Sequence, residues 1–154
     1  MIRYLNAAEP LPWALLLDAD PEEALVRNYL ATSQLLVFEE EQQILGEVVF
    51  QLRETEAELM NVAVAPSAQG KGIGKQLVQA TLKELQQQIT KPTEVLVKTG
   101  DITGPAVGLY KSCGFQEKAR VENYFVHHYS EPIYEDGVRL KHQLILNQWL
   151  TPKK

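Results

Sequence analysis

The clearest pattern in the chain is a run of apolar side chains at steps of three and four residues between positions 72 and 89. That spacing places them on one face of an α-helix, so the segment predicts an amphipathic helix that packs on a core. Pro92 follows the end of the pattern, as is usual beyond a helix. The short apolar segments 57–64 and 94–98 predict buried strands on either side of this helix.

The remaining segments show either the three- to four-residue period of a helix or the alternation of a strand. Strands are predicted where apolar residues alternate or cluster between turn residues, and helices where capping residues precede an apolar pattern. The other predicted strands lie at residues 1–6, 35–38, 43–53, 116–129 and 138–146. The other predicted helices lie at residues 20–33 and 104–114. Together the elements predict one α/β domain over residues 1–154, with a mixed, mainly antiparallel, twisted sheet of about six or seven strands and helices on both faces.

Composition narrows the class of protein. Apolar residues make up 45% of the 154 residues and charged residues 23%, which is ordinary for a globular domain with a sizeable core. No apolar run reaches the roughly eighteen residues of a membrane span, and the N-terminus lacks the pattern of a signal peptide. The one cysteine, Cys113, excludes an internal disulfide, fits a reducing cytoplasm and is expected to be buried. Adjacent His127 and His128 lack the spacing of zinc ligands, so no metal site is predicted.

Charge is distributed unevenly along the chain. The net charge is −5, but residues 70–98 carry five lysines and two glutamates, a sum of +3, so the rest sums to −8. The basic part suggests an anionic cofactor and the acidic part a cationic partner, although the lysines could simply solvate a helix face. Nucleic-acid binding is not expected, because an acidic protein lacks the basic surface that it requires.

A glycine-rich run, Gln69-Gly70-Lys71-Gly72-Ile73-Gly74, joins the strand 57–64 to the helix 72–89. Helix starts have unpaired N–H groups and partial positive charge, and glycines let those groups surround an anion, so a phosphate-bearing ligand is expected here. The chain lacks the G-x-x-x-x-G-K-[ST] pattern of nucleotide hydrolases, and Lys75 stands where the dinucleotide fingerprint needs its last glycine. The run matches a third pattern, Q/R-x-x-G-x-G/A. An ordinary glycine-rich turn is the alternative.

A second segment, about forty residues downstream, matches the pattern A-x-x-L-Y-x-x-x-G-F. The matching residues are Ala106, Leu109, Tyr110, Gly114 and Phe115. With both patterns at this separation, the chain resembles the GNAT superfamily, the acetyl-CoA-dependent N-acetyltransferases, over about residues 35–116. The resemblance implies the GNAT fold, N-acetyltransferase activity and acetyl-CoA as co-substrate.

The resemblance also implies a set of cofactor-binding residues. In this family the strand before the glycine run splays from its neighbour, the pantetheine amides pair with its free edge, and a backbone N–H there can stabilise the thioester oxygen. Thr103 stands where the family often has an Asn that meets the pantetheine arm, and it is expected to substitute. The residues expected to bind the cofactor are Val62, Ala63, Val64, Gln69, Gly70, Lys71, Gly72, Ile73, Gly74, Lys75, Thr103 and Tyr110. Plain buried strand is the alternative for residues 62–64.

Two side chains are candidates for catalytic proton transfer. The resemblance puts the Tyr110 hydroxyl near the coenzyme sulfur, and a phenol with a pKa of about 10 is protonated at neutral pH and can donate to the leaving thiolate. Glu58 stands fourteen residues before Gly72. This position matches that of the glutamate that serves as the catalytic base in the histone-acetylating branch of the family. Deprotonating an amine at neutral pH costs about 4 kcal/mol, which a positioned carboxylate helps to offset. Alternatively, His127, His128 or a water chain takes this proton. Tyr110 would then be an aromatic residue of the core, or Glu58 a charged residue on the surface, without a catalytic role.

The acceptor is predicted to be a small cationic amine. Residues 124–136 combine aromatic and acidic side chains, which suit such a group through ion pairing and cation–π contact. The residues expected to bind it are Tyr124, Glu131 and Glu135. The sequence thus indicates a cytoplasmic N-acetyltransferase in which the amine attacks acetyl-CoA directly in a ternary complex, with a homodimer left open as its assembly. The alternative is an acyl-CoA-binding sensor or interaction module without catalysis.

Overall fold

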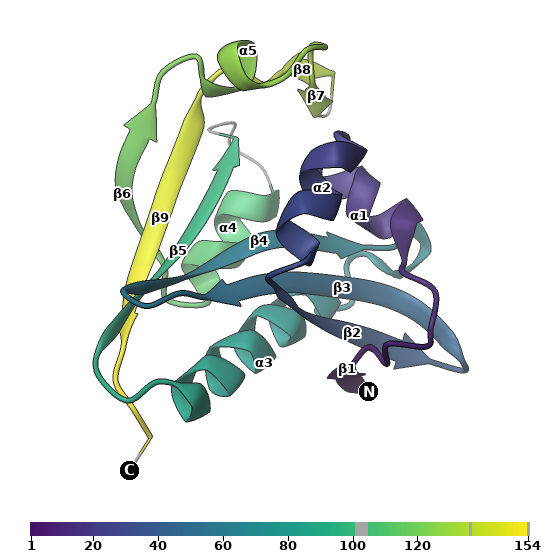
Figure 1. Cartoon of the computed structure of the whole chain (residues 1–154). Helices are drawn as coiled ribbons and strands as arrows, with labels where there is room; N and C mark the ends of the chain where they lie inside the picture. Colours follow the sequence, from purple (N-terminus) through teal and green to yellow (C-terminus); the bar gives the residue numbers. More distant parts are fainter. Residues whose placement is uncertain (101–104, 136, 154) are drawn as a thin grey trace.

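The computed structural model describes residues 1–100, 105–135 and 137–153, which form a sheet with helices on both sides (Figure 1). The helices are α1 (Trp13–Ala19), α2 (Glu23–Leu30), α3 (Ile73–Gln88), α4 (Pro105–Ser112), α5 (Tyr124–His128) and the short 3₁₀ helix η1 (Pro66–Ala68). The strands are β1 (Ile2–Tyr4), β2 (Gln34–Glu40), β3 (Gln43–Leu52), β4 (Glu56–Val64), β5 (Thr93–Gly100), β6 (Gln116–Val121), β7 (Tyr134–Glu135), β8 (Val138–Arg139) and β9 (Gln143–Leu150).

One large sheet contains seven of these strands, in the order β1-β2-β3-β4-β5-β9-β6, and β7 and β8 form a separate hairpin. Neighbouring strands of the large sheet are antiparallel except for β4 and β5. This confirms the predicted α/β class and the mixed, mainly antiparallel sheet. In the described part of the chain the longest helix, α3, has 16 residues, and none of the helices there has both the length and the apolar character of a bilayer span.

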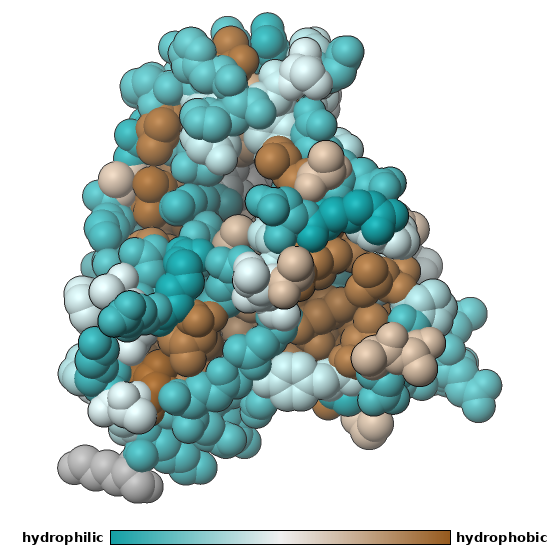
Figure 2. Space-filling view, viewed as in Figure 1, coloured by the Kyte–Doolittle hydropathy of each residue, from teal (hydrophilic) through white to brown (hydrophobic). Residues whose placement is uncertain are grey.

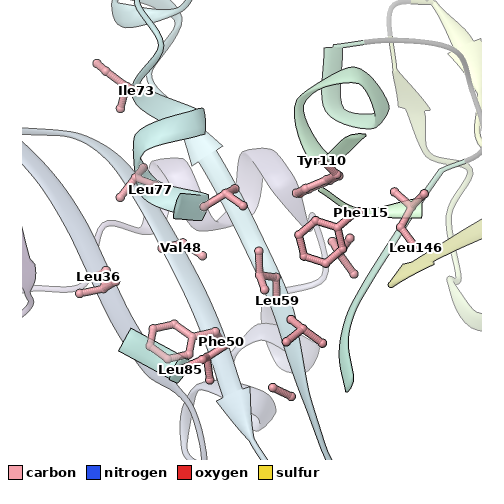
Figure 3. Close-up of a cluster of buried hydrophobic side chains, with 14 of the residues drawn as sticks. Leu36, Val48, Phe50, Leu59, Ile73, Leu77, Leu85, Tyr110, Phe115 and Leu146 are labelled. Carbon is pink, nitrogen blue, oxygen red and sulfur yellow. The ribbon is translucent and has the colours of Figure 1, made fainter. Parts of the chain in front are cut away.

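Helices cover both faces of the sheet, as predicted. On one face α3 and α4 pack through the main cluster of buried side chains, which Figure 3 shows extending from Leu36 on β2 to Phe115 just after α4. On the other face α1 and α2 pack through a smaller cluster around Leu16, Val26 and Val49. Each such side chain contributes roughly 1.5–3 kcal/mol when it leaves water, so both helical layers hold the sheet in place.

The strands β4 and β5 run side by side for only part of their length. Their backbones pair over Glu56–Leu59 and Glu94–Val97. Beyond that point β4 continues to Val64 and β5 to Gly100 without further pairing between them. An unpaired backbone edge inside a sheet is unusual, because its N–H and C=O groups need partners. The structure therefore has a gap between two central strands that a ligand with amide groups could fill.

The segment after Gly114 differs from the prediction. Residues 116–129 were predicted as one long strand, but they form β6 and then the helix α5. The reason is Asn123, which has a left-handed backbone (φ 54°) and whose carbonyl accepts the amides of Val126 and His127. Asn adopts this conformation more readily than most residues, so it can turn a strand into a helix within one or two positions.

Two other boundaries also differ. The predicted strand 138–146 is divided into β8 and β9, and the predicted helix 20–33 is the shorter α2. The helix α1 was missed, because Pro10 and Pro12 were interpreted only as the end of a strand. Pro12 instead caps α1, and its carbonyl accepts the amides of Leu15 and Leu16. Proline costs little at a helix start, because the N–H that it lacks would be unpaired there.

Candidate active site

The glycine-rich run forms the connection between β4 and α3. Gly70 and Gly72 have left-handed backbone angles (φ +81° and +79°), which favour glycine because a Cβ would strain them. Apart from each glycine and its two neighbours in the chain, no heavy atom of the described residues lies within 4 Å of where their Cβ atoms would be. Gly72 is the N-cap residue of α3, and no side chain within the described ranges makes a capping hydrogen bond there. The start of α3 therefore presents unpaired amides and partial positive charge to open space, as an anion site requires.

The other predicted residues of the run have different contacts. The side-chain amide of Gln69 donates to the Val64 carbonyl (3.1 Å), which folds the run back onto the end of β4. Ile73 is buried in the main core cluster and anchors the first turn of α3. Lys71 and Lys75 are exposed beside the helix start. The loop backbone and the two lysines are thus accessible to a ligand, whereas the Ile73 side chain packs in the core.

The unpaired edge of β4 carries a defined set of polar groups. The Ala65 amide donates to the Leu45 carbonyl on the β3 side (2.8 Å). Backbone groups alternate sides along a strand, so the groups of Ala63 also face β3, and those of Val62 and Val64 face the open side. Val62 therefore offers a backbone donor and acceptor to a ligand in the gap, and Val64 offers its N–H, because its carbonyl accepts the Gln69 amide. Ala63 offers only its methyl group.

The two sequence motifs meet where α3 contacts α4. A Cβ added to Gly74 would stand 3.3 Å from Leu109 Cδ2, so the helices are in close contact there. Tyr110, the next residue on α4, is 7% exposed and stands edge-on to Phe115, with 6.0 Å between ring centroids. Figure 3 shows both rings at the α4 end of the main cluster. Tyr110 is therefore held beside the start of α3, and Thr103 lies outside the described residues.

Glu58 lies on the sheet face opposite Tyr110, because its neighbour Leu59 belongs to the main cluster. Its side chain is buried, its Oε1 accepts a hydrogen bond from Arg53 (2.7 Å), and the same oxygen is 3.6 Å from Lys98 Nζ. It stands where β4 still pairs with β5. Glu58 is thus a buried, ion-paired carboxylate at the base of the gap, rather than the surface charge that was its alternative.

The predicted acceptor-binding residues lie on and after α5. Tyr124 is half-buried and stacks on His128, with 4.2 Å between ring centroids. Glu131 is exposed, and the side chain of Glu135 lies outside the described residues. His127 and His128, the alternative bases, are exposed on α5.

Hydrogen bonds connect this segment to the loop between α1 and α2. The Tyr129 hydroxyl donates to Asp20 (3.2 Å), and the Ser130 hydroxyl donates to Glu22 (3.1 Å). Figure 1 shows α5 and the β7–β8 hairpin above the ends of α2 and β5, and in Figure 2 hydrophilic side chains dominate that part of the surface. The segment therefore faces the same side of the sheet as α1 and α2.

A polar group under α1 and α2 was not predicted from the sequence. Glu47 on β3 is fully buried, and neither of its carboxylate oxygens has a hydrogen-bond partner among the described residues. Burial raises the pKa of this carboxyl well above its usual value. Near it, Asn61 donates to the Tyr29 hydroxyl (2.9 Å), which donates to Asp20 (3.3 Å). A charged residue inside the apolar strand 43–53 was the signal that could have found this group.

Replacing Glu47 with Gln is expected to stabilise the protein increasingly as pH rises. Below about pH 4.5 the carboxyl is protonated in both folded and unfolded chains, so the two proteins should differ little. Above that pH the unfolded chain loses the proton while the folded chain keeps it, so wild-type stability falls by roughly 1 kcal/mol per pH unit until the raised pKa is reached. Gln mimics the neutral acid and avoids this loss. Thermal melting of both proteins from pH 4 to 9 measures it.

The comparison of the two proteins isolates Glu47 from its titratable neighbours. Asp20, whose pKa is also raised by burial, is present in both proteins, and Tyr29, whose pKa is raised by burial, stays protonated from pH 4 to 9 with or without Glu47. A stability difference that does not change with pH would show that Glu47 is not held as a buried, unpaired carboxyl.

Comparisons with known proteins agree with this geometry. Residues 31–117 match the family model described as an acetyltransferase (GNAT) domain. The N-acetyltransferase YvbK of Bacillus subtilis (strain 168) is 32% identical over 128 residues, which cover 82% of this chain and 81% of that protein. A GNAT family acetyltransferase from Elizabethkingia anophelis with acetyl-CoA bound has a TM-score of 0.90 at 30% identity, over 97% of each chain. A Bacillus subtilis acetyltransferase in complex with CoA has a TM-score of 0.86 at 27% identity, over 99% of this chain and 98% of that one.

Proposed function

Because the chain belongs to the GNAT family of acetyltransferases, we propose that it moves an acetyl group from acetyl-CoA to the primary amine of a small cationic acceptor. Acetyl-CoA is the co-substrate. The bound amine attacks the thioester directly in a ternary complex, which avoids a covalent acetyl-enzyme. The observation that carries the proposal is the open edge of β4 beside the uncapped start of α3, with α4 packed against that start.

The cofactor occupies this edge from one end to the other. Its pyrophosphate accepts hydrogen bonds from the amides of residues 70–75, and Lys71 and Lys75 offset its charge. Its pantetheine amides pair with the backbone of Val62 and Val64, as an added strand pairs with a sheet edge. Thr103 contacts the pantetheine arm. A backbone N–H of β4 then stabilises the oxygen of the thioester as negative charge develops on it.

Two proton transfers accompany the attack. Tyr110 gives its phenolic proton to the coenzyme sulfur as the carbon–sulfur bond breaks, because a thiol with a pKa above neutral is released in its protonated form. Glu58 takes the proton that the amine loses, directly or through water. The ion pairs with Arg53 and Lys98 support the role of Glu58, because they fix the position of its carboxylate.

The acceptor is proposed to bind over the α1–α2 face, between the sheet and α5. Tyr124, Glu131 and Glu135 contribute an aromatic surface and negative charge that suit a cationic amine. The hydrogen bond between Tyr129 and Asp20 supports this location, because it brings the acidic segment over that face. The lone cysteine fits a cytoplasmic location for the enzyme.

A panel of small amines tests the proposal, with release of free CoA thiol as the readout. Cationic diamines and polyamines are expected to be better acceptors than neutral or anionic amines, with a KM that rises with salt because exposed ion pairs are screened. Replacing both Glu131 and Glu135 with Gln should raise the KM for the best acceptor by roughly two- to thirtyfold and leave the KM for acetyl-CoA unchanged.

The matched control replaces Glu40 and Glu41 with Gln, which makes the same change in net charge at the exposed end of β2 and the first turn residue after it. This control should keep the wild-type KM for both substrates. A neutral or anionic best acceptor, or equal effects of the two double substitutions, would refute the proposed acceptor class.

A further inference from the structure

Glu47 lies on the sheet face that the acceptor is proposed to use. Its carboxyl group is buried and has no hydrogen-bond partner among the described residues. Its cross-strand neighbours are Val37 on β2 and Ala63 on β4. Its neighbour Val48 belongs to the main cluster on the α3 face, so the Glu47 side chain points to the α1–α2 face. The side chain is fully buried, and both oxygens lack a hydrogen-bond partner among the described residues. A buried carboxyl of this kind is costly, so a partner that is not part of the chain is the natural explanation.

A third unpaired oxygen lies on the same face. Asn61 stands two residues before Ala63 on β4 and is 4% exposed. Its amide nitrogen donates to the Leu16 carbonyl and to the Tyr29 hydroxyl, both at 2.9 Å, whereas its Oδ1 has no partner within the described ranges. The side chain is therefore fixed at both of its N–H groups and leaves one acceptor unused.

The tyrosine hydroxyls that the structure describes on this face already donate their protons. The Tyr29 hydroxyl donates to one oxygen of Asp20 (3.3 Å), and the Tyr129 hydroxyl donates to the other (3.2 Å). The charge of Glu47 helps to raise the pKa of the Tyr29 phenol, after burial and Asp20, so Tyr29 and Glu47 are close enough to interact. Two carboxylates and an amide oxygen thus share a region whose hydroxyl and amide protons are already used.

We infer that Glu47 and Asn61 bind the ammonium group of the acceptor amine. An ammonium group has three N–H donors and no acceptor, which matches the two free oxygens of Glu47 and the one of Asn61. Its positive charge compensates the buried carboxylate. This inference rests on the proposed function and adds to it the place where the reacting nitrogen binds.

The position of this ammonium site suits acetyl transfer. Glu47 pairs across the sheet with Ala63, which stands between Val62 and Val64 on the open edge of β4. Adjacent strands are about 4.8 Å apart, so the site is one strand away from the proposed thioester position. The methyl group of Ala63 is the smallest side chain that could stand between them. An amine held here can therefore reach the thioester once it has lost a proton.

Glu47 and Glu58 have separate parts in this arrangement. Glu58 already has two cations, Arg53 and Lys98, whereas Glu47 has none among the described residues. Glu47 is accordingly the group that binds the positively charged ammonium group of the acceptor, and Glu58 is the proposed proton acceptor. Burial raises the pKa of Glu47, so binding of an ammonium group should ionise this carboxyl and release its proton.

The direct test observes the Glu47 carboxyl in the complex of the protein with CoA. Glutamate is labelled with ¹³C at the side-chain carboxyl, and the Glu47 signal is assigned by its loss in Glu47→Gln. Without amine, burial keeps this carboxyl more protonated than exposed glutamates at the same pH, so its signal is expected closer to the position of the acid. Titration with n-butylamine hydrochloride should move it to the position of a carboxylate, and n-butanol at the same concentrations should not.

Kinetics with the best amine of the panel provide the second readout. Glu47→Gln should raise the amine KM by roughly 30-fold or more, because a buried charge loses its partner. It should leave the acetyl-CoA melting shift unchanged. Glu58→Gln should instead lower kcat. Glu94→Gln is the control, since Glu94 is paired with Lys118 between β5 and β6, and it should change neither constant.

The outcomes separate this inference from the proposed function. A Glu47 signal that does not respond to n-butylamine, or an unchanged amine KM in Glu47→Gln, overturns the ammonium site even if the enzyme acetylates amines. A signal that responds in a protein that acetylates no amine supports the site and refutes the proposed function. A signal that moves equally with n-butanol shows only that the buried carboxyl becomes hydrated, and it also overturns the inference.

Discussion

Replacing Gly72 with Asp is expected to abolish the rise in melting temperature that acetyl-CoA gives the wild-type protein. At a hundredfold excess over its Kd, a ligand stabilises the fold by about 2.7 kcal/mol, which is a rise of roughly 5–10 °C for a chain of this length. Gly72 caps α3, and the described residues leave open space where its Cβ would point. An Asp side chain there would put a carboxylate where the pyrophosphate is proposed to bind, and like charges repel. Melting curves with and without acetyl-CoA measure the effect.

Gly137→Asp is the matched control for this substitution. Gly137 has nearly the same backbone angle (φ +77°) and, among the described residues, equally open surroundings, but it lies between β7 and β8. Asp tolerates this conformation better than most residues, so both variants should fold and melt close to the wild type without ligand. If Gly72→Asp keeps the full shift, or Gly137→Asp loses it as well, the pyrophosphate is not bound at the start of α3.

Replacing Tyr110 with Phe is expected to lower kcat by about 10²–10⁴-fold and to leave the affinity for acetyl-CoA nearly unchanged. The substitution removes only the hydroxyl, so the edge-on contact of the ring with Phe115 should persist. The loss should appear in kcat rather than KM, because the proton is needed only as the carbon–sulfur bond breaks. Steady-state kinetics with a saturating acceptor, together with the acetyl-CoA melting shift, measure both quantities.

Tyr4→Phe controls for the loss of a tyrosine hydroxyl elsewhere. The Tyr4 hydroxyl on β1 interacts with Gln34 and Glu84, at the sheet edge away from the gap between β4 and β5. This variant should lose only a little stability and retain wild-type kcat. An unchanged kcat in Tyr110→Phe would mean that Tyr110 only packs in the core, or that water supplies the proton.

Local patterns predicted the part of the fold that lies around the proposed cofactor site. The helix α3 and the strands β4 and β5 were placed correctly to within about two residues, because each has a strong apolar period and is bounded by glycine or proline. The glycines at positions 70 and 72 were correctly read as a tight connection, since their left-handed angles are ones that other residues rarely adopt. Local sequence was sufficient there because the geometry is itself local.

The proposed acceptor side was harder to predict, because its geometry depends on contacts between distant segments. The helix α5 was missed because it begins at a single residue with a left-handed backbone, Asn123. In addition, aromatic residues such as Tyr124 are common in strands. Glu47 was not identified as a site residue because only the register of β3 against β4 places it opposite Ala63. The contact between Tyr129 and Asp20 joins residues that are far apart in the chain, and no local period indicates it.

Mass spectrometry of a single turnover tests the central claim most directly. The protein, in excess over acetyl-CoA, is mixed with the best cationic amine of the panel, and the reaction is stopped at intervals. Direct transfer predicts that the amine gains one acetyl group as CoA is released, while the mass of the protein stays unchanged throughout. A transient acetylated protein would contradict direct attack, and bound acetyl-CoA that yields no acetylated amine would contradict the proposed transfer itself.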